Sequence, residues 1–360
     1  MGTGILSLPL AGVGMGLWGI MIPLLIAGGA SYLIYLALSE LTRRSNPPVQ
    51  LLTILERHLF TGRWAKVLRL VFFGLFTFVF FQSLVTYVVV AGQALSPMTG
   101  WPVWLGMIIF TAVGLGISLL GIMAVTTWES VSVGLIAVTI ATLSILSLTH
   151  HVRPVPMGFN SPWMSFGLFT LFMYAFSAIF AVVQVASHVP LAINLKAALG
   201  IGLAINMIGT LCFMLAVTSS SDVVTPVGSV GLAESLGGPI AMIAAGVFVI
   251  LAMITSYWPS LIAFADIMHE AFAIKPRVGQ LTAAIPSLLI AIFCPLTILD
   301  YIKMGAGAIS LIIIILIIPA YHHAIRLRQP PPLIGKNGRE AMMIITLTIV
   351  SVSMLIGGFL

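Results

Sequence analysis

Charged residues are scarce in this chain of 360 residues. Asp, Glu, Lys and Arg make up only 7% of it, while hydrophobic residues make up 60%. A soluble domain carries about 25% charged residues, because its surface faces water. So low a charge content predicts that most of the surface faces lipid, and therefore that the protein is embedded in a membrane.

Several chemical signatures are also absent. Cys212 and Cys294 are the two cysteines; each lies in an apolar run, so we interpret them as buried thiols rather than a disulfide. No G-x-x-x-x-G-K-[ST] motif occurs, which argues against ATP as an energy source. The stretch "HEAFA" lacks the second histidine of a zinc-binding helix. We expect no enzyme, no cofactor and no metal site beyond a coupling ion.

Long apolar runs are what the chain has instead. About 20 apolar residues span a bilayer as a helix, because every backbone polar group must be paired inside lipid. The alternating pattern of a membrane β-barrel is missing. After a short run at 1–12, ten long runs follow at 16–39, 67–95, 101–123, 131–149, 163–187, 193–217, 236–262, 280–298, 306–325 and 341–360. We predict an all-α integral membrane protein with eleven spans in one domain, 1–360.

The positive charges predict the orientation of these spans. If the spans alternate in direction, thirteen of the 15 Lys and Arg residues face one side, and Arg153 and Lys303 face the other. Cytoplasmic loops collect Lys and Arg, so the first span should run outward. The net charge of +6 then reflects orientation and contact with anionic lipid headgroups. We expect the lipid bilayer as a partner and no nucleic acid.

The connections between spans predict little further structure. In "VQLLTILERHLFTG", residues 51–59 place Leu51, Leu52, Leu55 and Leu59 on one helical face, which predicts a short helix in the inner membrane interface. The outer connections are rich in Pro, Gly and Ser and are predicted as loops. We interpret Glu129 and Asp266, the acidic residues nearest to span interiors, as groups that cap or bridge inner helix ends.

The opening "MGTGILSLPLAG" has an unusual composition for a membrane helix. Gly2, Thr3 and Gly4 weaken a helix at the start of an apolar run. An unwound stretch inside a span exposes backbone N–H groups and carbonyls that can bind a zwitterion without buried charges. Such folds carry a second break in a corresponding span. We place it at Tyr174 to Ala178, although this stretch has no glycine or proline.

Four stretches together resemble one family. "GTGILSLPLAGVGMG" is similar to its first-span motif G-[AT]-G-[MI]-L-x-L-P-x-A, and "TYVVVAGQAL" to its third span. "VFVILAMITSYWPSLIAFADIM" resembles its eighth span, and "IPSLLIAIFCPLTILDYIKMGAGAISLIIIILIIPAYHHAIR" its ninth and tenth. The family is the amino acid/polyamine/organocation superfamily. Within it, the resemblance is to hydroxy and aromatic amino-acid permeases, namely the tryptophan/tyrosine permease and amino acid transporter family.

The resemblance implies a leucine-transporter-like fold of two inverted five-helix repeats. Repeat one would cover about 1–149, repeat two about 163–325, and an eleventh helix 341–360. The first helix would lack its inner half before Met1. The implied function is a secondary active transporter that moves an amino acid, aromatic or hydroxy, across the cytoplasmic membrane by ion-coupled symport with alternating access.

The resemblance also implies the roles of individual residues. It implies substrate-binding residues that match family positions, namely Gly2, Thr3, Gly4, Tyr87, Tyr174, Ala175, Phe176, Ser177 and Ala178. Thr255 and Ser256 match the hydroxyl ligands of a sodium site in some relatives. The coupling ion, proton or sodium, stays open, as do the particular amino acid and the oligomeric state.

Two departures from the family keep alternatives open. The family has a glycine and a proline in the sixth span, where this chain has Ala175 and Ala181. A ligand-sensing membrane receptor of the same superfamily, like a spore-germination subunit, would need neither residue. The short first span also leaves open an inactive, truncated permease.

Overall fold

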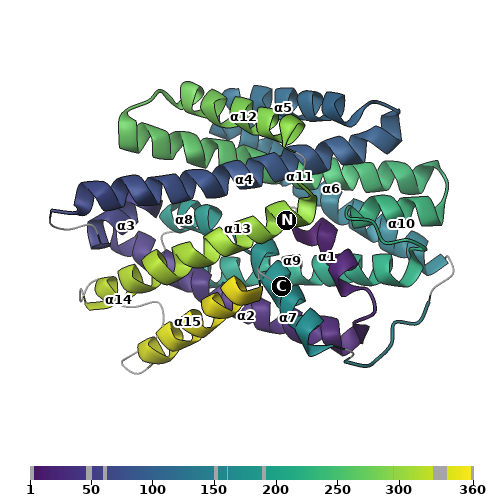
Figure 1. Ribbon diagram of the computed structural model, residues 1–360, viewed down its shortest axis with the longest axis horizontal. Coiled ribbons are helices and arrows are strands. Elements are labelled where there is room, and N and C mark those ends of the chain that lie inside the picture. Colours follow the sequence, from purple (N-terminus) through teal and green to yellow (C-terminus); the bar gives the residue numbers. More distant parts are fainter. Residues whose placement is uncertain are drawn as a thin grey trace.

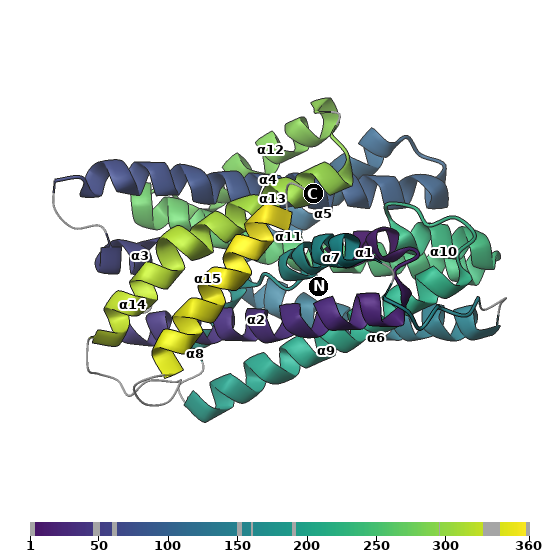
Figure 2. The ribbon, with the colours of Figure 1, turned by 60° about the horizontal axis from the view of Figure 1, so that its bottom comes forward.

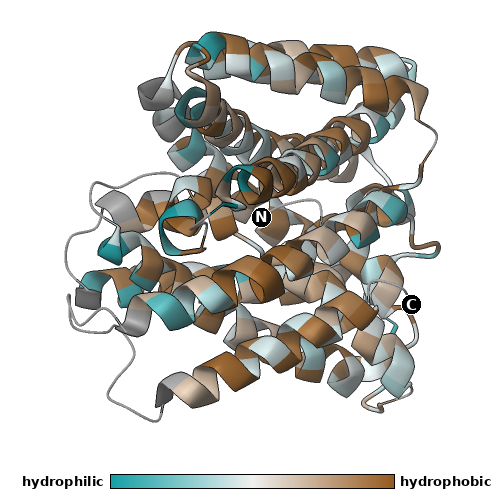
Figure 3. Ribbon diagram, turned by 60° about the vertical axis from the view of Figure 1, so that its left-hand side comes forward, coloured by the Kyte–Doolittle hydropathy of each residue, from teal (hydrophilic) through white to brown (hydrophobic). Residues whose placement is uncertain are grey.

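The computed structural model describes residues 4–45, 51–59, 63–149, 153–159, 161–188, 192–294, 296–326 and 339–357. These residues form helices joined by short connections, and none of them lies in a strand. Within the described ranges, seven helices are long and apolar enough to cross a membrane, and two shorter apolar helices accompany them. Figure 3 shows apolar residues along most of the length of the helices.

The described residues of the first half of the chain form six helices, labelled in Figure 1. They are α1 (Gly4–Gly12), α2 (Gly16–Arg44), α3 (Leu51–Leu59), α4 (Ala65–Thr99), α5 (Val103–Leu119) and α6 (Ile122–Thr149). The turn between α1 and α2 is tight. Gly16 there has φ +75°, and a Cβ on it would lie 2.2 Å from the carbonyl oxygen of Gly158, so this position requires glycine.

The second half begins with a helix that is interrupted. It contains α7 (Pro162–Ala175), α8 (Ile179–His188), α9 (Ala192–Ser220), α10 (Gly228–Leu236), α11 (Pro239–Phe272), α12 (Pro276–Phe293), α13 (Ile298–Ile312), a π-helical turn η1 (Ile313–Ile317), α14 (Ile318–Arg326) and α15 (Arg339–Gly357). Each of the eleven predicted apolar runs therefore corresponds to one helix or to helices joined end to end.

Long helices pack around α4 and α11. α11 contacts α6, α4 and α12, whereas α2 contacts α7 and α8. In Figure 1, α5 and α12 form the upper layer, and α15 lies at the bottom. Figure 2 shows α9 beside α2 and α6, and α15 beside α13. Tyr257 and Trp258 of α11 are fully buried at the centre of this packing.

The structure corrects three details of the sequence-based prediction. α10 lies in an outer connection that was predicted as a loop, because its Gly and Ser content hid a helix that packs against α11 and α9. α11 continues beyond the predicted apolar run at 236–262, so Asp266 lies within the last two turns of this helix, and its role there stays a prediction. The leucine face of α3 is mostly turned to protein, since Leu51, Leu52 and Leu55 are buried.

Polar contacts join α3 to α4 and α14 at one end of the bundle. The imidazole rings of His58 and His323 meet edge to face at 5.8 Å between centroids, which joins α3 to α14. Arg69 of α4 pairs with Glu56 at 2.8 Å. Burial lowers the pKa of His58, and the nearby positive charges, first that of His323, lower it further. Burial raises the pKa of Glu56, and Arg69 opposes this.

A buried ion pair lies next to this helix. Arg44 Nε and Glu40 Oε1 are 2.5 Å apart, and both side chains are only 2% exposed. Arg44 also donates through Nη1 to the carbonyl oxygen of Ala324 at 2.9 Å. The pair therefore ties the C-terminal end of α2 to α14.

Candidate functional site

The break between α7 and α8 is the centre of the candidate site. α7 begins at Pro162, where the Ser161 hydroxyl accepts the backbone N–H of Met164, and ends at Ala175. Residues 176–178 are not helical. The backbone N–H of Ser177 turns back to the carbonyl oxygen of Tyr174 at 3.0 Å, and the Ser177 hydroxyl donates to the same oxygen at 2.8 Å. The break predicted at 174–178 is confirmed, without glycine or proline.

The break leaves backbone groups that need partners. The Tyr35 hydroxyl of α2 donates to the carbonyl oxygen of Phe176. The first backbone N–H groups of α8, at 179–181, have no hydrogen-bond acceptor among the described residues. Because a helix start carries partial positive charge, these N–H groups can bind a negatively charged atom.

α1 begins beside this break. A Cβ on Gly4 would lie 2.5 Å from Cβ of Ala175 and 2.7 Å from its Cα, so the two backbones touch. Gly4 was predicted to be unwound. It is instead the first residue of α1, since its N-terminal position lets it pack against α7 while helical. Gly2 and Thr3, predicted with it, lie outside the described residues.

A cavity of about 230 Å³ opens where these elements meet. α1, α2, α4, α6, α7, α8, α9, α11 and α13 all contribute to its wall. Its lining residues are Gly4, Tyr35, Val79, Phe80, Ser83, Tyr87, Glu129, Tyr174, Ala175, Phe176, Ser177, Ala178, Ile179, Phe180, Ala181, Asn206, Thr255, Ser256, Pro259, Ser260 and Ile309. Every predicted site residue that the structure describes is in this wall. Their roles in binding remain predictions.

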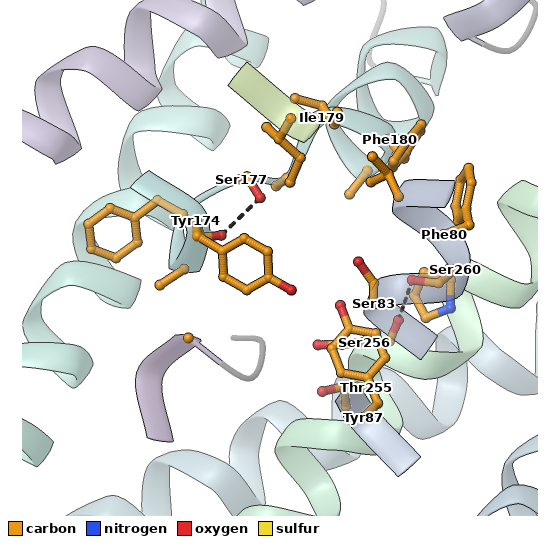
Figure 4. A pocket seen from close by; sticks show the side chains of 18 of the residues that line it. Phe80, Ser83, Tyr87, Tyr174, Ser177, Ile179, Phe180, Thr255, Ser256 and Ser260 are labelled. Atoms are coloured by element: carbon orange, nitrogen blue, oxygen red, sulfur yellow. Dashed lines mark hydrogen bonds between the residues drawn. The ribbon is translucent and has the colours of Figure 1, made fainter. Parts of the chain in front are cut away.

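Hydroxyl groups dominate one side of the cavity. Figure 4 shows the hydroxyls of Ser83, Thr255 and Ser256 gathered opposite the ring of Tyr174. The Tyr87 hydroxyl interacts with Ser83, Ser256 and Ser260. The hydroxyls of Thr255 and Ser256 both donate to the carbonyl oxygen of Ala252 at 3.2 Å, and a hydroxyl oxygen that donates can also accept or coordinate. Oxygen atoms arranged in this way suit a hard cation or a polar ligand.

Tyr174 is held in place from α4. Gln82 Nε2 donates to the Tyr174 hydroxyl at 3.3 Å and to the carbonyl oxygen of Tyr301 at 2.5 Å, and Gln82 is buried. Sequence reasoning did not single out Gln82, although an amide inside the apolar stretch "VFFQSLV" is a signal that could have found it.

Glu129 supplies the carboxylate of the cavity. The sequence-based interpretation of this residue is a group that caps or bridges an inner helix end, and the structure adds that it lines the cavity. No Lys, Arg or His is present among the described lining residues. Tyr35 and Asn206 were missed as well, because nothing local in the sequence shows which helix face turns inward.

The remaining lining residues are mostly aromatic or small. The rings of Phe80 and Phe180 lie 4.2 Å apart between centroids, and Phe264 lies 5.7 Å from Phe80. Three or more His, Cys, Asp or Glu side chains do not gather anywhere in the described part of the chain. The cavity therefore offers hydroxyls, carbonyls, aromatic rings and one carboxylate.

Comparisons with known proteins define the class of fold. The chain matches no model of a protein family, and no curated protein matches it in sequence. Solved structures do match in shape. One is Mhp1, a transporter of the nucleobase-cation-symport-1 family in a closed conformation with bromovinylhydantoin bound. The TM-score is 0.71 at 15% identity, over 99% of this chain and 86% of Mhp1.

Two further structures agree with this likeness. MhsT in complex with L-phenylalanine has a TM-score of 0.66 at 15% identity, over 99% of this chain and 95% of MhsT. The manganese transporter of Eremococcus coleocola, in complex with an aromatic bis-isothiourea substituted compound, has a TM-score of 0.62 at 16% identity, over 99% of this chain and 83% of that transporter. The chain is therefore a multi-pass membrane protein with the leucine-transporter-like fold. The division into repeats at about 149 and 163 stays a prediction.

Proposed function

We propose that this chain is a secondary active transporter, and not an enzyme, that carries an amino acid across the cytoplasmic membrane together with an ion. The observation that carries the proposal is the cavity in which Gly4 of α1 touches the α7–α8 break. In transporters built on broken helices, the substrate binds near the middle of the bilayer, and the two sides open in turn. The three solved structures of similar fold support this class of function.

The cavity suits an amino acid with an aromatic or hydroxylated side chain. Its carboxylate would face the free N–H groups at the start of α8, where the helix dipole favours negative charge. Its ammonium group would face the Glu129 carboxylate. The rings of Phe80 and Phe180 offer an aromatic side chain a stacking surface, and the hydroxyls of Ser83 and Tyr87 offer hydrogen bonds. MhsT was solved in complex with L-phenylalanine, and Mhp1 was solved with bromovinylhydantoin bound.

The coupling ion would be a proton or sodium, and the cavity contains a group for either. Glu129 is a carboxylate that can take up and release a proton at membrane depth. Thr255 and Ser256 can turn hydroxyl oxygens toward a sodium ion. We propose that one of these two places is the coupling site.

Uptake into proteoliposomes tests the function. Purified protein would be reconstituted and given labelled amino acids under an imposed proton gradient, a sodium gradient, or neither. We expect accumulation of at least one aromatic or hydroxy amino acid that depends on one gradient and collapses with an ionophore. Monodisperse elution on size-exclusion chromatography is the control for folded protein.

Three outcomes distinguish the alternatives. Gradient-dependent accumulation supports the transporter. Saturable amino-acid binding without accumulation would favour a ligand-sensing receptor of the same fold. Neither binding nor accumulation by folded protein would overturn the proposal for amino acids.

A further inference from the structure

A second concave site lies at the inner ends of α4 and α11, apart from the central cavity. It encloses about 260 Å³. Four residues of α4 and two of α11 line it: Lys66, Arg69, Leu70, Phe73, Ala271 and Phe272. None of these residues lines the central cavity. We call this site the inner groove.

The wall contributed by α4 changes from basic to apolar along the helix. Lys66, Arg69, Leu70 and Phe73 have the spacing i, i+3, i+4 and i+7, which places them on one helical face. Seven residues cover about 10 Å along the axis. The two cations are therefore nearest the helix end, and the apolar side chains lie one to two turns deeper. This is the polarity of a phospholipid, from headgroup to acyl chain.

The deeper part of the inner groove is aromatic and open to the surroundings. The rings of Phe73 and Phe272 meet edge to face at 4.8 Å between centroids, which joins the two helices. Leu70 is 66% exposed and Phe272 is 51% exposed. In a membrane-spanning helix such exposed apolar surface faces hydrocarbon, so an acyl chain can lie along it.

Neighbouring residues place the inner groove at the membrane interface. Trp64 is 58% exposed, and the guanidinium carbon of Arg63 lies 5.7 Å from the centre of its ring. Tryptophan and arginine together are typical of the boundary between headgroups and acyl chains. If the spans alternate as predicted, this end of α4 belongs to the side that carries thirteen of the Lys and Arg residues, which is the inner leaflet with its anionic lipids.

The charges in the inner groove favour an anion. Nε of Arg69 is 2.8 Å from Oε1 of Glu56, which holds the guanidinium in place. Its two terminal nitrogens form no ion pair with the residues that the structure describes. Lys66 forms no ion pair with any residue that the structure describes. The nearby carboxylate of Glu270 already accepts the hydroxyl of Thr53. Two positive groups thus face one side of the groove.

We propose that the inner groove binds an anionic phospholipid of the inner leaflet. The phosphate lies between Lys66 and the outer nitrogens of Arg69, and an acyl chain runs over Leu70, Phe73 and Phe272. Because α4 and α11 also contribute Ser83, Tyr87, Thr255 and Ser256 to the central cavity, a lipid bound here clamps two of its walls together.

Native mass spectrometry and thermal unfolding test this site. The full chain would be prepared in detergent micelles that contain phosphatidylcholine and titrated with phosphatidylglycerol. We expect one phosphatidylglycerol to stay bound and to raise the unfolding temperature. Lys66→Gln should weaken binding about fivefold, which is the effect of one basic residue near an anionic surface. Lys66→Arg should restore it.

Matched controls separate the site from general surface charge. Lys275→Gln removes the same charge on the same side but outside the inner groove, and we expect binding like that of the unmodified chain. Phe272→Ser should weaken the binding of phosphatidylglycerol, because it removes part of the surface for the acyl chain. Inorganic phosphate is a separate control, and we expect it not to bind to the unmodified chain. Equal losses in Lys66→Gln and Lys275→Gln, or stabilisation by inorganic phosphate alone, would overturn the proposal. Size-exclusion chromatography of each variant confirms that it is folded.

Discussion

At the scale of single residues, the contact between Gly4 and Ala175 makes the sharpest demand on side-chain size. The atoms that a Cβ on Gly4 would meet belong mainly to backbone and Cβ, which cannot swing aside. Gly4→Ala should therefore separate α1 from α7, at a cost of about 1–3 kcal/mol in the free energy of unfolding, and should lower amino-acid uptake.

Gly29→Ala is the matched control for this prediction. Gly29 lies inside α2, and a Cβ there would meet nothing within 4 Å. This change should leave uptake intact and should be neutral or stabilising by about 0.5–1 kcal/mol, because alanine favours a helix. Thermal unfolding in detergent and uptake assays measure both effects. Equal behaviour of the two variants would show that the contact at Gly4 is not tight.

The two kinds of ion pair in this chain should respond very differently to loss of a partner. Arg44→Ala leaves Glu40 buried without its cation, and we expect a loss of about 3–5 kcal/mol in the free energy of unfolding. Arg153→Ala breaks a pair with Asp222 whose side chains are 59% and 72% exposed. It should cost less than about 1 kcal/mol. Chemical unfolding of both variants measures the difference, and similar costs would contradict it.

At the scale of helices, α3 provides a dependence of stability on pH. Burial and nearby positive charge lower the pKa of His58 below its usual value of 6.5. The unfolded chain therefore binds this proton more readily than the folded chain. The stability from neutral His58 is complete above about pH 6.5, and it is lost as the pH falls below 6.5 toward the lowered pKa.

The variant His58→Gln isolates this effect. Glu56 on the same helix has a raised pKa, so its contribution has the opposite sign and falls as the pH rises above its usual value of 4.5. Glu56 is present in both the unmodified chain and His58→Gln, so its contribution cancels in the difference between their unfolding temperatures. We expect this difference to change between pH 7.5 and pH 5 and to be constant from pH 7.5 to pH 8.5. A difference that is constant over the whole range would rule out this role of His58.

The α7–α8 break shows how a membrane helix can be interrupted without glycine or proline. Tyr35 takes one carbonyl group of the break, and Ser177 bonds back to Tyr174. Side chains therefore replace the hydrogen bonds that the backbone loses. The absence of glycine and proline here is one reason to consider a receptor, and the break forms without either residue.

At the scale of the whole molecule, the coupling ion can be identified from two variants. Glu129→Gln removes the carboxylate of the cavity but keeps its shape, and Ser256→Ala removes one hydroxyl. Under proton coupling, Glu129→Gln should abolish uptake driven by a proton gradient and retain exchange of amino acid across the membrane. Under sodium coupling, Ser256→Ala should raise the sodium concentration needed for half-maximal uptake about tenfold or more. Unchanged gradient dependence in both variants would exclude both coupling sites.

The sequence by itself determined the membrane class and the eleven apolar segments. These features depend on local composition, because the bilayer imposes the same length and polarity on every span. Resemblance to a permease family added Tyr87, Thr255 and Ser256, which all line the cavity.

Only the tertiary structure decided which helix faces turn toward one another. It brought Glu129, Tyr35, Asn206 and Gln82 to the cavity or its supporting shell, and it turned the leucines of α3 toward protein. In lipid, both the buried and the exposed faces of a helix are apolar, so hydropathy carries little information about rotation around the helix axis. Close packing between helices sets that rotation, and with it the membership of the site.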